Sequence, residues 1–200
     1  MWLQSELDTM LNNQKNLFIL SGPSGCGKNT VFDELKKRVP IIQRAITVTT
    51  RELREHEVHG RDYYFVSELE FSRWKETGLF VESSFYDNAY YATPVSELER
   101  YSSDTPVFLI IDTLGKESVL RRYPKSSSIF LMPPSLDEVL HRIKERGANN
   151  EEQIERRMQR AKSEVAAASS YDYILINHNL DDCVAQLEEI VSQKLSSLIS

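Results

Sequence analysis

Short apolar runs and longer amphipathic segments alternate along the 200-residue chain. Runs of four or five apolar residues between polar turns are typical of strands buried in a parallel sheet, and they occur at 17–20, 107–111, 129–132 and 173–176. Helical spacing and cap signals predict helices at 31–39, 135–146, 151–169 and 181–195. This alternation indicates an α/β fold in which helices flank a parallel sheet.

The stretch from 47 to 92 interrupts this alternation. It is rich in β-branched and aromatic residues, and extended segments are expected at 41–50, 79–82 and 85–92. Because a β-rich stretch sits inside an α/β pattern, we interpret it as a small inserted subdomain that holds a substrate.

Two cap signals flank helices of this region. Ser67 and Glu70 have capping-box spacing and open a helix that continues to about Thr77. Thr93 is predicted to cap a later helix, with Pro94 at its first helical position.

The composition is that of a folded domain, with 40% hydrophobic and 27% charged residues. The net charge of −6 argues against general binding to nucleic acid or to anionic membranes. No apolar run approaches the ~18 residues that a membrane span needs. Only Cys26 and Cys183 are present, without CxxC spacing, so no disulfide framework or zinc site is expected. A cytoplasmic location is therefore the default expectation.

The first sixteen residues lack the basic start of a secretory signal. Leu3, Leu7, Met10 and Leu11 have helical spacing, which predicts a helix packed on the body or, alternatively, a helix that binds a partner.

The clearest motif is a glycine-rich segment between the first strand and the first helix. It reads SGPSGCGKNT from Ser21 to Thr30 and follows the G-x-x-x-x-G-K-[ST] pattern up to its last position. Glycines let successive backbone N–H groups point at one phosphate, and the helix N-terminus and the lysine add positive charge. The alternative is a glycine-rich turn with an incidental lysine. We predict an ATP site formed by Gly22, Pro23, Ser24, Gly25, Cys26, Gly27, Lys28, Asn29 and Thr30.

The last position of the motif departs from the pattern. Asn29 stands where a Ser or Thr hydroxyl normally binds Mg²⁺, and its amide oxygen is a candidate ligand instead. Thr30 is adjacent but rotated around the helix. Cys26 is interpreted as a filler side chain, with a redox switch as the alternative.

Several further segments occur in one order and spacing over about 17–190. They are TVTTRELR at 47–54, Glu57, Gly60, DYYFV at 62–66, FVE at 80–82, NAYY at 88–91, Ile111 and Asp112, PPS at 133–135, ERG at 145–147, Arg157 and Asn177. Together these segments resemble the guanylate kinase family. The resemblance implies a P-loop NTPase-type sheet with a GMP-binding insertion at 47–93, a core of 17–46 and 94–200, a helical lid at about 142–160, and an extension at 1–16.

The resemblance also implies an acceptor site. Arg51, Arg54, Tyr63 and Tyr91 would hold the monoester phosphate, and two guanidinium groups with two phenols suit that task. Taken alone, Arg51 and Arg54 would be interpreted as part of a solvated face, and for Glu82 a surface strand end and a binding residue would be equal alternatives. In the family's pattern Glu82 accepts hydrogen bonds from guanine, completed by Thr47 and Thr93, and Asp112 contacts the acceptor nucleotide or the water shell of Mg²⁺.

By the same resemblance, Arg142, Arg146 and Arg157 are lid residues that close over the transferred phosphoryl group, and Asn177 lies near the adenine. Lys28, Arg51, Arg146 and Arg157 are the implied catalytic residues. Without the phosphate loop, the charges around 151–160 would be read as a solvated helix with i,i+4 pairs.

The implied activity is that of a guanylate kinase, which transfers a phosphoryl group from ATP, with Mg²⁺, to GMP. The expected partners are ATP and GMP, and the chain is expected to be a monomer or a homodimer. Departures from the family occur at Asn29, Val48, Ala92, Ile110 and Leu114. Ile110, Leu114 and Val48 motivate one alternative, a P-loop kinase for another phosphorylated acceptor. A second alternative, from another functional class, is a catalytically weak binding module of the same family.

Overall fold

The computed structural model describes residues 16–145 and 150–196, which form two compact units. The phosphate-loop unit comprises the described residues of 18–42, 110–113 and 127–200. The β-rich unit comprises those of 1–17, 43–109 and 114–126. The helix predicted from Leu3 to Leu11 lies outside the described residues, so it stays a prediction.

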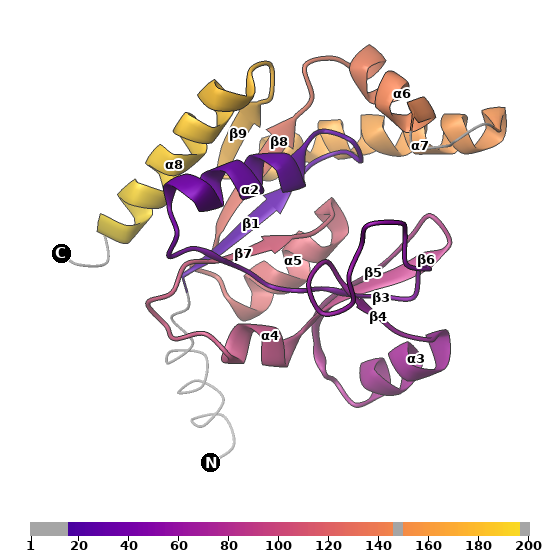
Figure 1. Ribbon diagram of the computed structural model, residues 1–200, viewed down its shortest axis with the longest axis horizontal. Helices are drawn as coiled ribbons and strands as arrows, with labels where there is room; N and C mark the ends of the chain where they lie inside the picture. The colour runs from indigo at the N-terminus through magenta and orange to yellow at the C-terminus, as the bar shows by residue number, and fades with distance from the viewer. Residues whose placement is uncertain (1–15, 146–149, 197–200) are drawn as a thin grey trace. The chain divides into compact units, whose positions relative to one another are not determined.

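Three parallel strands form the sheet of the phosphate-loop unit (Figure 1). β8 (Ser127–Met132) lies between β1 (Leu17–Ser21) and β9 (Tyr173–Ile176). Every residue of β1 is buried, whereas only Leu175 is buried in β9. The apolar runs therefore predicted these strands, and their expected parallel arrangement is confirmed.

Helices connect and cover these strands. α2 (Lys28–Arg38) packs against α8 (Leu180–Ser196), and α6 (Leu136–Glu145) packs against α7 (Glu151–Ala166) (Figure 1). The prediction of one helix over 151–169 is wrong in its last turn, because the chain tightens into a 3-10 helix over Ala167–Ser170.

The β-rich unit contains a four-stranded sheet in the order β4-β3-β6-β5. Its strands are β3 (Val48–Thr49), β4 (Tyr64–Phe65), β5 (Phe80–Tyr86) and β6 (Ala89–Pro94). β2 (Gln43–Arg44) pairs in parallel with β7 (Val107–Ile110), and the helices are α3 (Glu68–Glu76), α4 (Val95–Glu99) and α5 (Thr113–Arg122). The extended segment predicted at 41–50 thus forms only β2 and β3.

One face of this sheet is a small hydrophobic core. Val48 and Ala92 are buried there against Phe71 of α3, and the Phe71 ring stacks on Tyr90 with 5.0 Å between ring centroids. The capping box predicted at the start of α3 is confirmed, since Ser67 accepts from the Glu70 backbone N–H and Glu70 accepts from the Ser67 backbone N–H. The cap fixes where α3 begins and so places Phe71 over the sheet.

Two predictions in this region are wrong. Asp87 and Asn88 have φ of 51° and 61°, which turns the chain between β5 and β6 inside the strand expected at 85–92. Two left-handed residues are what a tight hairpin turn requires, and Asp and Asn tolerate that conformation. Thr93 is not a helix cap, because Pro94 takes that place and Thr93 is a buried residue of β6.

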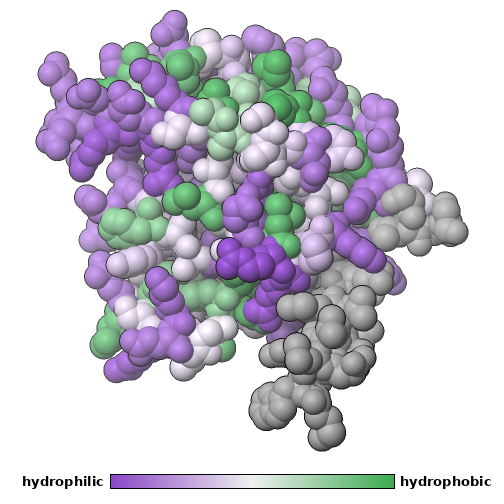
Figure 2. Space-filling view, turned by 180° about the vertical axis from the view of Figure 1, so that it is seen from behind, coloured by the Kyte–Doolittle hydropathy of each residue, from purple (hydrophilic) through white to green (hydrophobic). Residues whose placement is uncertain are grey.

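Hydrophilic and hydrophobic side chains intermingle on the face shown in Figure 2. Within the described ranges, no helix has the length and apolar character needed to cross a membrane.

Candidate active site

The phosphate loop has the backbone that its glycines predict. Gly27, at the N-terminal end of α2, has a φ of 99°, and a Cβ added there would lie 2.6 Å from the Asn177 amide nitrogen. A Cβ at Gly22 would lie 2.3 Å from the Leu131 carbonyl oxygen. Both positions therefore require glycine, and the loop is held close to β8 and to the segment after β9.

Lys28 lies over this loop. Its ammonium donates to the Gly22 carbonyl oxygen at 2.5 Å and to the Pro23 carbonyl oxygen at 3.1 Å. Asn29 and Thr30 follow in the first turn of α2, where both are exposed. Lys28 and the N-terminus of α2 therefore lie at the loop for which the sequence predicts phosphate binding.

Two further residues predicted to bind ATP are bonded to the loop. The Arg142 guanidinium donates to the Gly25 carbonyl oxygen at 2.7 Å and to Glu138 at 2.7 Å. The Asn177 side-chain amide donates to the Cys26 carbonyl oxygen at 2.8 Å. These bonds bring α6 and the segment after β9 to the phosphate loop.

The loop cysteine is a packed side chain. Cys26 is fully buried, and burial raises the pKa of its thiol although the nearby Lys28 ammonium acts in the opposite direction. A thiol in such surroundings is poorly reactive, which supports the filler interpretation over the redox switch.

Asp112 joins an ionic cluster that sequence reasoning did not identify. The Arg160 guanidinium, on α7, donates to Asp112 Oδ2 at 3.1 Å and to Glu164 Oε1 at 3.3 Å. Glu164 is only 5% exposed, and burial raises its pKa against the opposing charges of Lys28 and Arg160. The i,i+4 spacing of Arg160 and Glu164 predicts an ion pair between these two residues, but the same spacing is typical of a solvated helix.

The remaining lid residues are placed only in part. Arg157 lies half-buried on α7, one helical turn before Arg160 and Ala161. Arg146 lies outside the described residues, so its predicted role is untested.

In the β-rich unit, Arg51 is locked to a carboxylate. Its Nη1 and Nη2 atoms donate to the two oxygens of Glu57 at 2.9 and 2.8 Å, and the Arg54 backbone N–H donates to the same carboxylate at 2.9 Å. Burial alone would lower the pKa of Arg51, but Glu57 and Tyr91 outweigh it and the pKa is raised. Glu57 was not predicted as a site residue, and it keeps Arg51 both charged and oriented.

Aromatic side chains surround this guanidinium. Arg51 lies 5.3 Å from the centroid of the Tyr63 ring, and the Tyr63 and Tyr91 rings are 6.1 Å apart. Burial raises the pKa of the Tyr91 hydroxyl, while Arg51 opposes that rise. The structure therefore brings together Arg51, Tyr63 and Tyr91, whereas Arg54 is an exposed neighbour.

The predicted base-reading residues meet on the adjacent strands. Glu82 is 5% exposed and accepts a hydrogen bond from the Thr93 hydroxyl at 2.7 Å, across a cross-strand pair of β5 and β6. Thr47 is also buried. Because side chains alternate along a strand, Thr93 and Tyr91 share one face of β6, and Ala92 belongs to the opposite core face.

The core face holds two of the residues that depart from the family pattern. Val48 and Ala92 pack against Phe71 on that face, away from the Thr93 side of β6. Leu114, at the start of α5, is 63% exposed. Val48 and Ala92 therefore lie on the face of the sheet opposite to Tyr91 and Thr93, whereas Leu114 is at the surface.

Oxygen donors for a metal ion are present but dispersed. Asn29 is exposed at the start of α2, and Asp112 offers a carboxylate that Arg160 also contacts. Across residues 16–145 and 150–196, no three or more His, Cys, Asp or Glu side chains gather into a metal-binding group.

Comparisons with known proteins agree with this arrangement. The family model for guanylate kinase matches residues 14–194. A guanylate kinase of Prochlorococcus marinus is 38% identical over 182 residues, covering 90% of this chain and 99% of that protein, and one of a Nostoc species is 41% identical over 175 residues, covering 87% and 86%. The crystal structure of guanylate kinase from Anaplasma phagocytophilum superposes with a TM-score of 0.74 at 27% identity, covering 90% of this chain and 86% of the other. By sequence and by fold, this chain belongs to the guanylate kinase family.

Proposed function

We propose that this chain transfers the γ-phosphoryl group of ATP to GMP, which forms ADP and GDP. The observation that carries the proposal is the buried Glu82 carboxylate, which Thr93 contacts on the face of β6 that also carries Tyr91. A carboxylate accepts hydrogen bonds from the N1–H and the 2-amino group of guanine, whereas it would repel the N1 lone pair of adenine. The relatives named guanylate kinase support the same reaction.

The proposed acceptor phosphate binds beside Arg51. The guanidinium, with the Tyr63 and Tyr91 hydroxyls, supplies donors for a dianionic monoester, and Arg54 adds a second positive charge. The acceptor oxygen is already anionic, so the reaction needs no strong general base. The protein's task is to neutralise and align the phosphates for in-line displacement.

The proposed donor phosphates bind at the loop after β1. Backbone N–H groups of Gly25 and Gly27, the N-terminus of α2 and Lys28 supply the positive potential. Arg142 and Asn177, which hold the loop, are proposed to contact ATP, and Arg146 and Arg157 to stabilise the transferred group.

We propose that Mg²⁺ accompanies ATP. Its ligands would be mainly phosphate oxygens, together with the Asn29 amide oxygen and, through water, Asp112, since hard oxygen donors suit this ion. Bound Mg²⁺ would neutralise phosphate charge. The cytoplasmic location and the monomeric or homodimeric state stay predictions from the sequence.

A coupled assay of ADP release tests the proposal. With saturating Mg-ATP, the acceptors GMP, dGMP, AMP, UMP, CMP and IMP are compared, and GMP is expected to give the highest kcat/KM. A preference for a pyrimidine nucleotide would favour the kinase of another acceptor. Absence of turnover with GMP would favour the binding module. Lys28→Ala serves as the inactive control.

A further inference from the structure

We propose that Arg160 is a positioning residue for the acceptor reaction, acting through Asp112. It lies on α7 and is not among the lid arginines implied by the family pattern. The inference rests on the proposed function. Of the two roles expected for Asp112, a contact with GMP and a contact with the water shell of Mg²⁺, it concerns the contact with GMP.

The geometry of the bridge carries the proposal. One guanidinium contacts two carboxylates that are 52 residues apart in the chain, Asp112 through Nη2 and Glu164 through Nε. Glu164 precedes the end of α7 and is nearly buried, so it anchors Arg160 to its own helix. The outer nitrogen then fixes one oxygen of Asp112, and the orientation of that carboxylate depends on α7.

The backbone of Asp112 lies next to the end of β1. The Ser21 hydroxyl, at the end of β1, lies 3.5 Å from the Asp112 carbonyl oxygen. The phosphate loop starts directly after Ser21. Arg160 thus links α7, which belongs to the predicted lid, to a residue that adjoins the loop through β1.

The charge balance gives a reason for a guanidinium here. The Glu164 carboxylate is within electrostatic reach of both Lys28 and Asp112, so two negative charges gather beside the lysine that is proposed to bind phosphate. Arg160 offsets one of them and has the planar fork that two carboxylates on different elements require. A lysine would keep the charge but would lack that fork, so it should replace Arg160 only in part.

A double-mutant cycle on Asp112 and Arg160 tests the inference. The variants are Arg160→Gln, Asp112→Asn and their combination, measured by KM for GMP, KM for ATP and the dissociation constant of GMP by calorimetry. Arg160→Gln is expected to raise KM and the dissociation constant for GMP about tenfold, the loss of one charge-assisted hydrogen bond, and to change KM for ATP less than about twofold. In the combined variant, KM and the dissociation constant for GMP are expected to lie within about twofold of those of Asp112→Asn, because Arg160 acts through Asp112.

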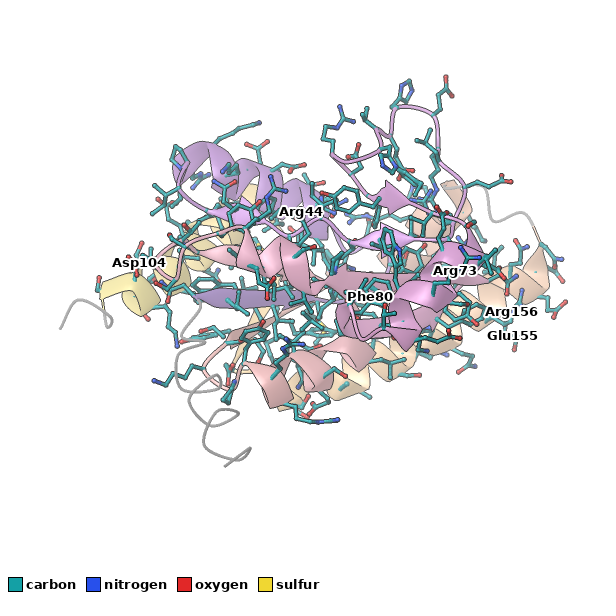
Figure 3. All side chains as sticks on the ribbon, turned by 90° about the horizontal axis from the view of Figure 1, so that it is seen from below. Arg44, Arg73, Phe80, Asp104, Glu155 and Arg156 are labelled. Carbon is teal, nitrogen blue, oxygen red and sulfur yellow. The ribbon has the colours of Figure 1, made fainter. Side chains whose placement is uncertain are left out.

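Two more variants separate positioning from folding. Arg160→Lys is expected to give an intermediate KM for GMP with an unchanged Tm, so it remains informative if Arg160→Gln does not fold. Arg156→Gln removes the same charge from an exposed site on α7, where Arg156 and Glu155 extend outward (Figure 3), and should leave all constants within about twofold.

The outcomes are distinct. Three results would each overturn the role of Arg160. The first is a combined variant whose loss of GMP affinity equals the product of the two single losses. The others are an unchanged KM for GMP in Arg160→Gln and a loss of equal size in Arg156→Gln. Absence of GMP turnover in the unaltered chain would overturn the proposed function itself, which is a different result.

Discussion

At the scale of the residue, the buried carboxylate on β5 is the sharpest determinant of the proposed acceptor. We expect Glu82→Gln to lower kcat/KM for GMP about 100-fold, because a neutral amide would lose two charge-assisted hydrogen bonds to guanine. The Thr93 hydroxyl can still donate to the Gln oxygen, so the fold should persist. The coupled assay of ADP release, with the same acceptor nucleotides as above, measures the effect.

The control for this prediction is Glu76→Gln, which removes the same charge from an exposed position on α3. This variant should leave kcat/KM unchanged for every acceptor. A loss of equal size for GMP and AMP in Glu82→Gln would contradict the guanine-reading role of that carboxylate.

The pair of Arg51 and Glu57 predicts a pH dependence of stability. Burial by itself would raise the pKa of Glu57, but Arg51 and the Arg54 backbone N–H bind the carboxylate and hold its pKa below the ordinary value. A carboxyl group with a lowered pKa in the folded state contributes stability above its unfolded pKa and loses it as the pH falls through the folded value. Glu57→Gln should therefore lower the free energy of unfolding by about 1 kcal/mol at pH 7, and the difference should vanish in acid.

Urea unfolding of Glu57→Gln and the unaltered chain, from pH 7 down to the lowest pH at which both fold, measures this difference. Exposed Glu55→Gln, two residues away, is the matched control and should show no such trend. A difference that grows in acid would contradict the ion pair as its cause.

At the scale of the element, apolar runs predicted the sheet of the phosphate-loop unit well. β9 has the bounds expected from its run, and the α3 capping box was readable because its two residues are local in sequence. The hairpin turn at Asp87 and Asn88 was missed, since neither residue is glycine and the aromatic residues around it continue the strand pattern. Thr93 before Pro94 fits a helix start equally well, and only its pairing with Glu82 across the hairpin decides otherwise.

The turn from β1 into α2 can be tested through its glycine. Gly27→Ala is expected to raise KM for ATP more than tenfold and to destabilise the protein by about 1–3 kcal/mol, because φ is positive and the new Cβ would meet the Asn177 amide. Gly78→Ala is the matched control, since Gly78 has a φ of 70° but nothing within 4 Å of an added Cβ. Gly78→Ala should destabilise the protein through backbone strain but should leave KM for ATP unchanged. An equal KM for ATP in both variants would contradict a role of the Gly27 turn in binding phosphate.

At the scale of the whole molecule, the backbone of the predicted phosphate loop could be predicted from the sequence, whereas the ionic contact between Arg160 and Asp112 could not. Lys28 and the glycines of the loop are adjacent in sequence, so their spacing alone predicts a turn of this kind. Arg160 and Asp112 are 48 positions apart, and in the sequence Arg160 resembles any charged residue of a solvated helix. Their contact depends on how α7 packs, which a charge pattern does not encode.

Both cysteines provide a test of folding in the phosphate-loop unit. Burial raises the pKa of the Cys183 thiol to about 11, from an ordinary value near 9. Burial also raises the pKa of the Cys26 thiol. At pH 8 the thiolate fraction of Cys183 should therefore be about 100-fold below that of a free cysteine. We expect both thiols to resist a disulfide reagent in the native protein and to react fully in urea.

Cys183→Ser leaves Cys26 as the one native thiol, so the two rates can be separated, and Ser103→Cys supplies an exposed thiol that should react at once. Because the folded pKa is raised, ionisation of either buried thiol opposes folding, so labelling should accelerate as the pH rises toward that value. Labelling at increasing urea should then follow the unfolding of this unit, measured by circular dichroism. Rapid labelling of Cys26 in the folded protein would contradict its burial and would favour a redox role for the phosphate loop.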